Sequence, residues 1–178
     1  NANAEEQIRY RAGADVVIKE TWMRLPGRGA TATASAADAD RAQQPSGSYV
    51  EPPFGRFRDL AGVVAATRAS RQSDASGQKL GGDSSGNLTL MGVVSHEFAT
   101  VAWFRPGLLP HHWYNYLNLL AASPAAALVS TSLRDAGLRL GDAIYLQARN
   151  QPPVVFSVHG FVDYWPTYNP YAGGTGGN

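Results

Sequence analysis

Cysteine is absent from the 178 residues of this chain. Its absence excludes disulfides, thiolate catalysis and zinc or iron–sulfur sites built on cysteine. Charge is sparse as well, because 16% of the residues are charged, and 15 basic against 14 acidic side chains leave a formal charge of +1. Basic runs are short, so the sequence predicts no nucleic-acid partner. No apolar run approaches the roughly 18 residues that a membrane span needs.

Helical and strand patterns are mixed without regular β–α–β alternation, which favours an α+β fold of mixed sheets and short helices. The length fits a single domain, which we expect over residues 1–178 with an ordered core over about 10–170. Small and polar residues over 25–48 predict a mobile loop, because they bury too little surface to offset the entropy of ordering. The glycine-rich residues 172–178 predict a flexible tail, and with the abrupt start they lead us to expect a fragment of a longer protein.

Strands are predicted from β-branched and alternating residues in the first half of the chain. The first lies over 13–22. A strand over 63–71 and another over 87–94 are expected to pair as a hairpin, with a flexible turn region over 73–86 between them.

Helices are predicted from apolar residues at helical spacing. One starts at the prolines at positions 52 and 53 and stops at Gly62, since proline suits the first helical turn. Another has Ser95 as its N-cap. A third covers 111–123 and carries its apolar side chains on one side, namely Trp113, Tyr116, Leu117 and Leu120.

The last third of the chain shows the most regular pattern. It predicts a short strand over 124–130, a helical turn capped by Gly137, and a closing hairpin. The apolar faces of that hairpin are Ile144 and Leu146 on one strand, and Val154, Phe156 and Val158 on the other. Gly141 and Asp142 are predicted to turn the chain sharply into the hairpin, since glycine permits positive φ and the Asp142 carboxylate can bond the backbone that follows it.

Histidines give the first candidates for chemistry. His111 and His112 are adjacent, so on a helix they point about 100° apart and we expect a polar helix start rather than a metal site. His96 and Glu97 are followed by Thr100, where a zinc-protease motif needs histidine, so Glu97 is expected only to favour the positive helix end.

The other polar candidates also have a structural interpretation. His159 is expected to be half-buried in a strand. No nucleophile-elbow motif surrounds Ser130, Thr131 and Ser132, so an N-cap role for one of them is predicted. Asp38 and Asp40 lie in the loop over 25–48 and lack the further spaced ligands of a calcium loop. The sequence thus predicts no catalytic residue, no metal site and no cofactor.

Aromatic residues form two clusters. The first contains Trp103, Phe104, Trp113, Tyr114 and Tyr116, and the second contains Tyr164, Trp165, Tyr168 and Tyr171. They are candidates for ordinary core, for contact with a partner or a membrane interface, and for stacking on a ligand. Within these clusters the candidate contact residues are Trp103, Trp113, Tyr114, Tyr164 and Trp165.

A resemblance adds to these patterns. The segment 127–170 carries Gly-Leu-Arg-Leu-Gly-Asp, then a strand, then Phe156-Ser-Val-His-Gly-Phe-Val-Asp-Tyr-Trp-Pro-Thr167. It resembles the extracytoplasmic domain of FtsX/MacB-like ABC transporter permeases. Residues 10–18, 60–70 and 88–105 resemble, in the same order, further segments of that family.

The resemblance implies a mixed fold, often in two lobes, on the extracytoplasmic face of the membrane between the first and second membrane helices of the same chain. It implies no enzyme: a separate cytoplasmic subunit or domain binds ATP, and its motion is relayed outward to substrate or partner. Family permeases pair through their membrane helices, so a permease dimer is implied as well.

Two other functions fit the residues. An extracytoplasmic carbohydrate- or ligand-binding module would use the aromatic clusters. A hydrolase would use His96, Glu97 or His112 and would need these groups to converge in one pocket.

Overall fold

The computed structural model describes residues 2–20, 23–24, 49–50, 53–80, 82, 84–148 and 151–168. It forms two compact units, and the smaller one is Ile18–Val63. In that unit, β1 (Met23–Arg24) pairs antiparallel with β2 (Tyr49–Val50), and α2 (Gly55–Arg58) forms a single turn. The predicted loop over 25–48 and tail over 172–178 lie outside the described residues.

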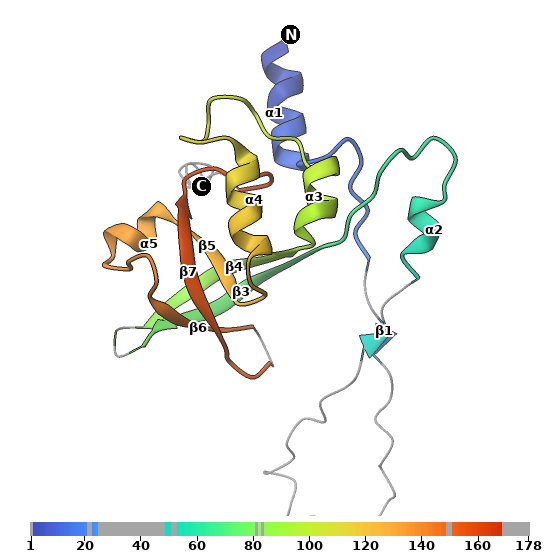
Figure 1. The fold of residues 1–178 in the computed structure, drawn as a ribbon. Coiled ribbons are helices and arrows are strands. Elements are labelled where there is room, and N and C mark those ends of the chain that lie inside the picture. The colour runs from blue at the N-terminus through green and yellow to red at the C-terminus, as the bar shows by residue number, and fades with distance from the viewer. Residues whose placement is uncertain are drawn as a thin grey trace, which may run out of the picture. The chain divides into compact units, whose positions relative to one another are not determined.

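The described residues of the larger unit form one five-stranded sheet and four helices (Figure 1). The helices are α1 (Ala2–Ala12), α3 (Ser95–Val101), α4 (Trp113–Ala121) and α5 (Thr131–Asp135). The strands are β3 (Ala69–Lys79), β4 (Ser84–Val93), β5 (Ala126–Ser130), β6 (Ala143–Gln147) and β7 (Val154–Val162). Their order in the sheet is β4-β3-β6-β7-β5, with β5 parallel to β7 and the other pairs antiparallel. The α+β fold with a mixed sheet is therefore confirmed.

The closing hairpin forms as its alternation predicts. β6 and β7 pair antiparallel, with Ile144 opposite Phe156. Ile144 is 4% exposed and Val158 is 1% exposed, so the predicted apolar face does lie in the core. Only the beginning of β7 departs from the prediction, because Val154 is 51% exposed.

The first hairpin is longer than its composition predicts. β3 begins at Ala69 instead of residue 63 and continues to Lys79, and β4 begins at Ser84, so the predicted flexible region over 73–86 is largely strand. The reason is tertiary, because β3 is an inner strand that bonds β4 on one side and β6 on the other. Its small residues suit this place: Ala75 is 1% exposed, and a Cβ on Gly77 would lie 2.6 Å from the Leu88 side chain.

The predicted strand over 13–22 is wrong for its described part, residues 13–20, which have no strand structure. Val16, Val17 and Ile18 are instead exposed by 76%, 55% and 57%. A β-branched run becomes a strand only when another strand takes its backbone hydrogen bonds. No described strand pairs with this segment.

The helices keep their predicted places but differ at their ends. α2 follows Pro53 and ends at Arg58, before Gly62, whose φ is +86°. α3 begins with Ser95 as its first helical residue, so the predicted Ser95 N-cap is wrong and Val94 holds that position. α4 begins one residue after His112.

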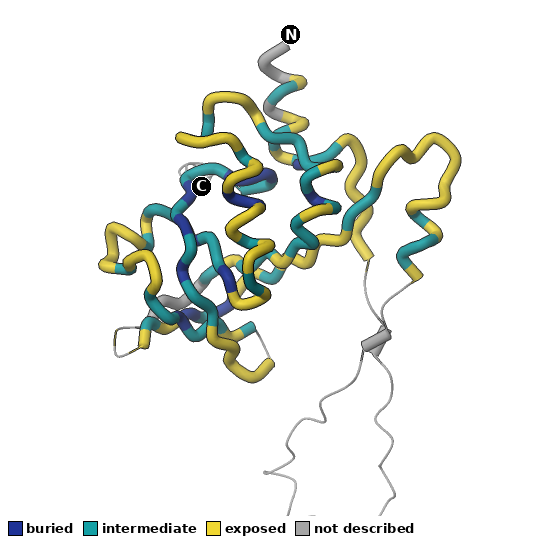
Figure 2. Tube along the Cα trace, in the orientation of Figure 1, coloured by how far each residue is buried: buried dark blue, intermediate teal, exposed yellow. Residues whose placement is uncertain are grey.

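Two apolar clusters build the core of the larger unit. Figure 2 marks the buried residues along the chain in dark blue. The first joins α3 and α4 to β7 through its buried residues Phe98, Tyr116, Leu117, Val162 and Trp165. The second has Val129, Ile144 and Val158 at its centre, with Leu133 of α5 packed against them. Strand β5 serves both clusters, since Leu128 contacts the first and the next residue belongs to the second, as side-chain alternation requires.

Candidate functional site

Three segments that lie far apart in the sequence meet where α1 ends. The Tyr10 hydroxyl donates to the carbonyl of Tyr168 at 2.9 Å, and the Thr167 N–H donates to the carbonyl of Tyr10 at 3.2 Å. The Trp103 N–H donates to the carbonyl of Gly13 at 2.9 Å. We call these five residues the end junction. It fixes the end of α1 beside the last described residues, whereas the N-terminal end of α1 points away from the sheet (Figure 1).

Glycine is required at one position of the end junction. Gly13 ends α1 with φ of +78°, and its N–H donates to the Arg9 carbonyl at 2.7 Å. A Cβ at this position would lie 2.7 Å from Cγ2 of Thr167. On the other side of the contact, Pro166 is fully buried and Thr167 has φ of +72°. Both segments are thus shaped for close approach.

Burial raises the pKa of the Tyr10 hydroxyl to about 12, although a backbone hydrogen bond at Trp165 acts in the opposite direction. The phenol therefore keeps its proton at neutral pH and remains a donor to Tyr168. The ring of Tyr10 also meets the Trp103 ring edge to face, with centroids 6.5 Å apart. The end junction is held by both hydrogen bonds and aromatic packing.

The two predicted aromatic clusters are one structure. Trp165, which is 9% exposed, meets Phe104 edge to face at 5.2 Å, and Phe104 stacks on Trp113 at 4.9 Å. Trp113 stacks on Tyr114 at 4.2 Å, and Tyr114 stacks on His112 at 5.6 Å. We call these five rings the aromatic ladder. It runs from the core to the surface, where Tyr114 is 51% exposed.

Two further candidate contact residues lie outside the aromatic ladder. Trp103 is half-buried in the end junction, and Tyr164 is half-buried just after β7. Tyr171 lies outside the described residues. Of the five predicted contact residues, Tyr114 therefore offers the most exposed ring, and Trp113 lies partly buried beneath it.

His112 has a structural role at the beginning of α4. It is the N-cap, and its Nδ1 accepts a hydrogen bond from the Tyr114 N–H at 3.3 Å. This use of a ring nitrogen agrees with the prediction of a polar helix start. Among the described residues, no group of three or more histidine, aspartate or glutamate side chains could hold a metal ion.

The candidates for hydrolysis are not brought together. His96 is exposed on α3, and Glu97 beside it is half-buried. In the part of the chain that the structure describes, no hydrogen bond or ion pair joins either residue to His112. One carboxylate oxygen of Glu97, Oε2, is buried without a hydrogen-bond partner among the described residues. His159 is half-buried in β7, as predicted.

The three hydroxyl residues where β5 ends and α5 begins do not cap α5 with their side chains. Ser130 holds the N-cap position, but its Oγ lies 2.7 Å from the Ser132 Oγ and bonds no backbone N–H of the helix. The Thr131 hydroxyl donates to the carboxylate of Asp163 instead. The predicted N-cap position is therefore confirmed at Ser130, although its side chain makes no cap bond, and the Thr131 hydroxyl joins α5 to the residue that follows β7. Asp38 and Asp40 lie outside the described residues.

The Gly141–Asp142 turn is confirmed, but its bonds differ from the prediction. Gly141 has φ of +83°, and its N–H donates to the Val158 carbonyl at 2.8 Å. The Asp142 carboxylate accepts from the Arg139 N–H at 2.8 Å, which is the backbone before it rather than after it. It also pairs with Lys79 Nζ at 2.7 Å. The Lys79 hydrogen bond and the Arg139 N–H hold the pKa of Asp142 below its usual value.

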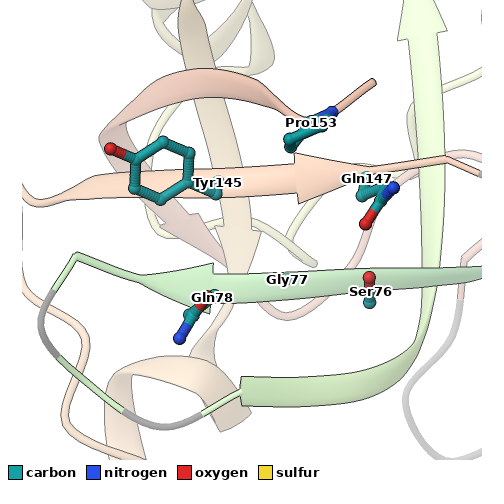
Figure 3. Close-up of a pocket in the computed structure, with 6 residues that line it drawn as sticks. All are labelled: Ser76, Gly77, Gln78, Tyr145, Gln147 and Pro153. Carbon is teal, nitrogen blue, oxygen red and sulfur yellow. The ribbon is translucent and has the colours of Figure 1, made fainter. Parts of the chain in front are cut away.

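A shallow depression of about 320 Å³ lies on the sheet beside the closing hairpin (Figure 3). Cross-strand pairs place its residues together, because Ser76 is opposite Gln147 and Gln78 is opposite Tyr145. Gly77 and Pro153 complete the lining, which carries no charged side chain. Both glutamine amides bond carbonyls nearby, Gln78 to Gly82 at 3.4 Å and Gln147 to Gln151 at 3.1 Å.

Comparison of the chain with protein-family models, with curated protein sequences and with solved structures found no match. No helix among the described residues is both long enough and apolar enough to span a bilayer. The end junction, the aromatic ladder and the depression are thus the features on which a function can be based.

Proposed function

We propose that this chain is a noncatalytic extracytoplasmic domain of an ABC-type permease, which relays ATP-driven motion of the membrane helices to a substrate or partner outside. The observation that carries the proposal is the end junction. A domain inserted between two membrane helices has to begin and end at the same place. Tyr10 bonds Tyr168 at 2.9 Å and Thr167 at 3.2 Å, which brings the end of α1 and the last described segment together as that requirement asks.

The character of α1 supports the same proposal. Among the side chains of this helix that the structure describes, Glu5, Ile8, Arg9 and Arg11 are all exposed and form no continuous apolar face against the core. A helix that is polar all round is typical of a bridge between parts of a protein. In a permease, α1 would continue outward from the first membrane helix.

To relay force, the domain needs a rigid connection between the end junction and the sheet. Trp103 joins the end junction to α3, and the aromatic ladder continues from α3 through Phe104 to α4 and Trp165. Close-packed interiors transmit displacement instead of absorbing it. Tilting α1 would therefore tilt the larger unit as one body.

The parent reading frame tests the proposal. It is expected to carry apolar stretches of about 20 residues before and after this chain, with a gene for an ATP-binding subunit adjacent or fused. A frame without these stretches would refute the permease proposal.

A test of mechanism uses the absence of cysteine in the chain. A disulfide between Tyr10→Cys and Thr167→Cys in the whole permease joins two segments that already contact each other, so transport is expected to survive it. A matched pair of single cysteine variants controls for the substitutions. Loss of transport only on oxidation of the double variant would show that the two segments must separate, and would contradict the proposal of a rigid body.

A binding module for carbohydrate or another uncharged ligand is the second candidate. The uncharged depression favours it, since hydroxyl, amide and aromatic groups suit such ligands. This module would not need membrane spans beside it, and Tyr145→Ala would abolish binding of oligosaccharides in a calorimetric titration. If titration of the unaltered chain with oligosaccharides produces no heat of binding, this candidate is excluded.

A further inference from the structure

The five-stranded sheet ends in two edge strands of unequal length. β4 has ten residues and β5 has five, and among the described residues no further strand pairs with the outer side of either. The outer side of an edge strand presents backbone N–H and C=O groups that another strand can bond. β4 therefore gives this sheet its longer open edge.

β4 lacks the residues that usually keep an edge strand unpaired. Natural edge strands carry charged side chains or proline, which hinder the approach of a second strand. Residues 84–93 read Ser-Ser-Gly-Asn-Leu-Thr-Leu-Met-Gly-Val, with neither a charge nor a proline. A bulge is present near the beginning, because β4 takes one residue more than β3 between Ser85 and Leu88. The stretch Leu88–Val93 follows without a further extra residue in β4, so its edge is regular.

The regular stretch of β4 also leaves apolar side chains half-buried. Leu88 and Leu90 are half-buried on one face of the strand, and Thr89 between them is exposed on the other. Leu88 packs closely over the sheet, since its Cδ1 lies 2.6 Å from the position that a Cβ on Gly77 would take. A strand added to this edge would cover the remaining surface of both leucines while it bonds the backbone.

We propose that β4 pairs antiparallel with β4 of a second copy of this chain, so that two sheets join across a two-fold axis. The inference goes beyond the permease function and does not depend on it. Only residues whose backbone groups point outward bond across the new contact, and these alternate along β4, so the axis passes through a residue. An axis at Thr89 or at Leu90 keeps both leucines in the pair. Thr89 then lies either directly opposite its copy or diagonal to it, at about 7–8 Å.

The composition of β4 favours a second copy as the occupant. Because β4 carries no charge, a two-fold pair sets no like charges opposite each other, and a pair of threonines across strands is favourable. The formal charge of the chain is only +1, so repulsion between two copies is small. Pairing over about seven to nine residues gives about six to ten main-chain hydrogen bonds, as many as a typical stable interface has.

Other strands of a second copy fit this edge less well. β4 against the outer side of β5 would leave an open edge on each copy and would form a chain of molecules, whereas two β4 edges close into a dimer. The exposed Val16–Ile18 is short and has Asp15 and Lys19 close by. In β7 only Val154–Phe156 extends beyond the pairing with β5.

Charge reversal at Thr89 tests the pairing. Because Thr89 is exposed, Thr89→Lys and Thr89→Asp change the edge without altering the core, and circular dichroism checks that both fold. Sedimentation velocity at a series of concentrations measures the equilibrium between monomer and dimer. We expect the unaltered chain to dimerise, and each variant alone to raise the dissociation constant by roughly tenfold or more, since like charges meet at the axis. An equimolar mixture of the two variants should regain the dimer, because lysine then meets aspartate.

Matched controls place the same charge on exposed β-branched residues elsewhere. Val17 is 55% exposed and Val155 is 46% exposed, and Val17→Lys and Val155→Lys should leave the equilibrium unchanged. Hydrogen exchange of the unaltered chain needs no substitution: the amides of β4 should exchange more slowly as concentration rises, and those of β5 should not.

Several results would overturn the inference. A chain that stays monomeric at every concentration has no such contact, and a dimer that survives both Thr89 variants uses another surface. Variants that lose the dimer but do not regain it in the mixture would exclude two-fold pairing at Thr89. Assemblies that grow beyond two copies would do the same, since a closed pair leaves no β4 edge free.

Discussion

Gly160 of β7 lies close to Leu128 of β5 and Leu119 of α4, and Gly160→Ala tests this packing. A Cβ at this position would lie 2.8 Å from Cδ2 of Leu128 and 3.5 Å from Cδ1 of Leu119. The first distance is too short for two carbon atoms, so Leu128 would have to move. The residue is buried, and Leu128 packs against the first core cluster, so there is little room for that movement.

Two opposing effects determine how much Gly160→Ala changes the free energy of unfolding. Overpacking a core costs about 1–3 kcal/mol. Alanine recovers roughly 0.5–1 kcal/mol, because glycine loses more backbone entropy in a strand. The net expectation for Gly160→Ala is a loss of about 1–2 kcal/mol in the free energy of unfolding, which lowers Tm by about 2–8 °C in a chain of this size.

Thermal and urea unfolding followed by circular dichroism measure the loss. Gly92→Ala is the matched control in β4, because its Cβ would meet only the hydroxyl of the exposed Ser70, which can rotate away. Leu128→Ala supplies the rescue: the double variant should be less destabilised than the sum of the two single variants, by about 1 kcal/mol. A Gly160→Ala chain that melts at or above the wild-type temperature, or strict additivity with Leu128→Ala, would refute the close approach.

Three further predictions concern the end junction, the turn and the core. Burial raises the pKa of Tyr10 to about 12 in the folded chain, from about 10 in the unfolded chain. Its contribution to the free energy of unfolding is therefore complete below pH 10 and is lost as pH rises from 10 to 12. Thermal melts of Tyr10→Phe across that range should not show this loss. The pKa of Asp142 is lowered, so its pairing with Lys79 stabilises above about pH 4 and fades as pH falls; Asp142→Asn should lower Tm at pH 7 and match wild type in acid. Phe98→Ala removes a ring that is 4% exposed and stacks on Trp165, and should cost about 3–5 kcal/mol in urea unfolding.

The sequence predicts well those elements whose own residue pattern determines which side chains are buried. The closing hairpin alternates, and α4 repeats its apolar residues at helical spacing, so burial of Ile144, Tyr116 and Leu117 follows from the pattern. The turn at Gly141 follows from the freedom of glycine at positive φ. Local rules suffice for these cases.

The features that escape prediction depend on distant residues. The small, polar end of β3 becomes strand because β6 lies beside it, and the β-branched Val16 and Val17 do not, since no described strand pairs with them. The end junction joins Tyr10 to Tyr168 across 158 positions, and neither residue has a local signal for that contact. The aromatic ladder was visible as two clusters, but only the fold brings Phe104 to Trp165.

The end junction also bears on how the chain can be rearranged. Since Tyr10 and Thr167 share a backbone hydrogen bond, a short linker of glycine and serine is enough to close residues 10–167 into a circle. That circle can then be opened at the exposed Gln151 between β6 and β7, giving a permuted protein that leaves the five-stranded order intact. The fold therefore allows the chain to begin and end at a new position, while the order of the strands in the sheet stays the same.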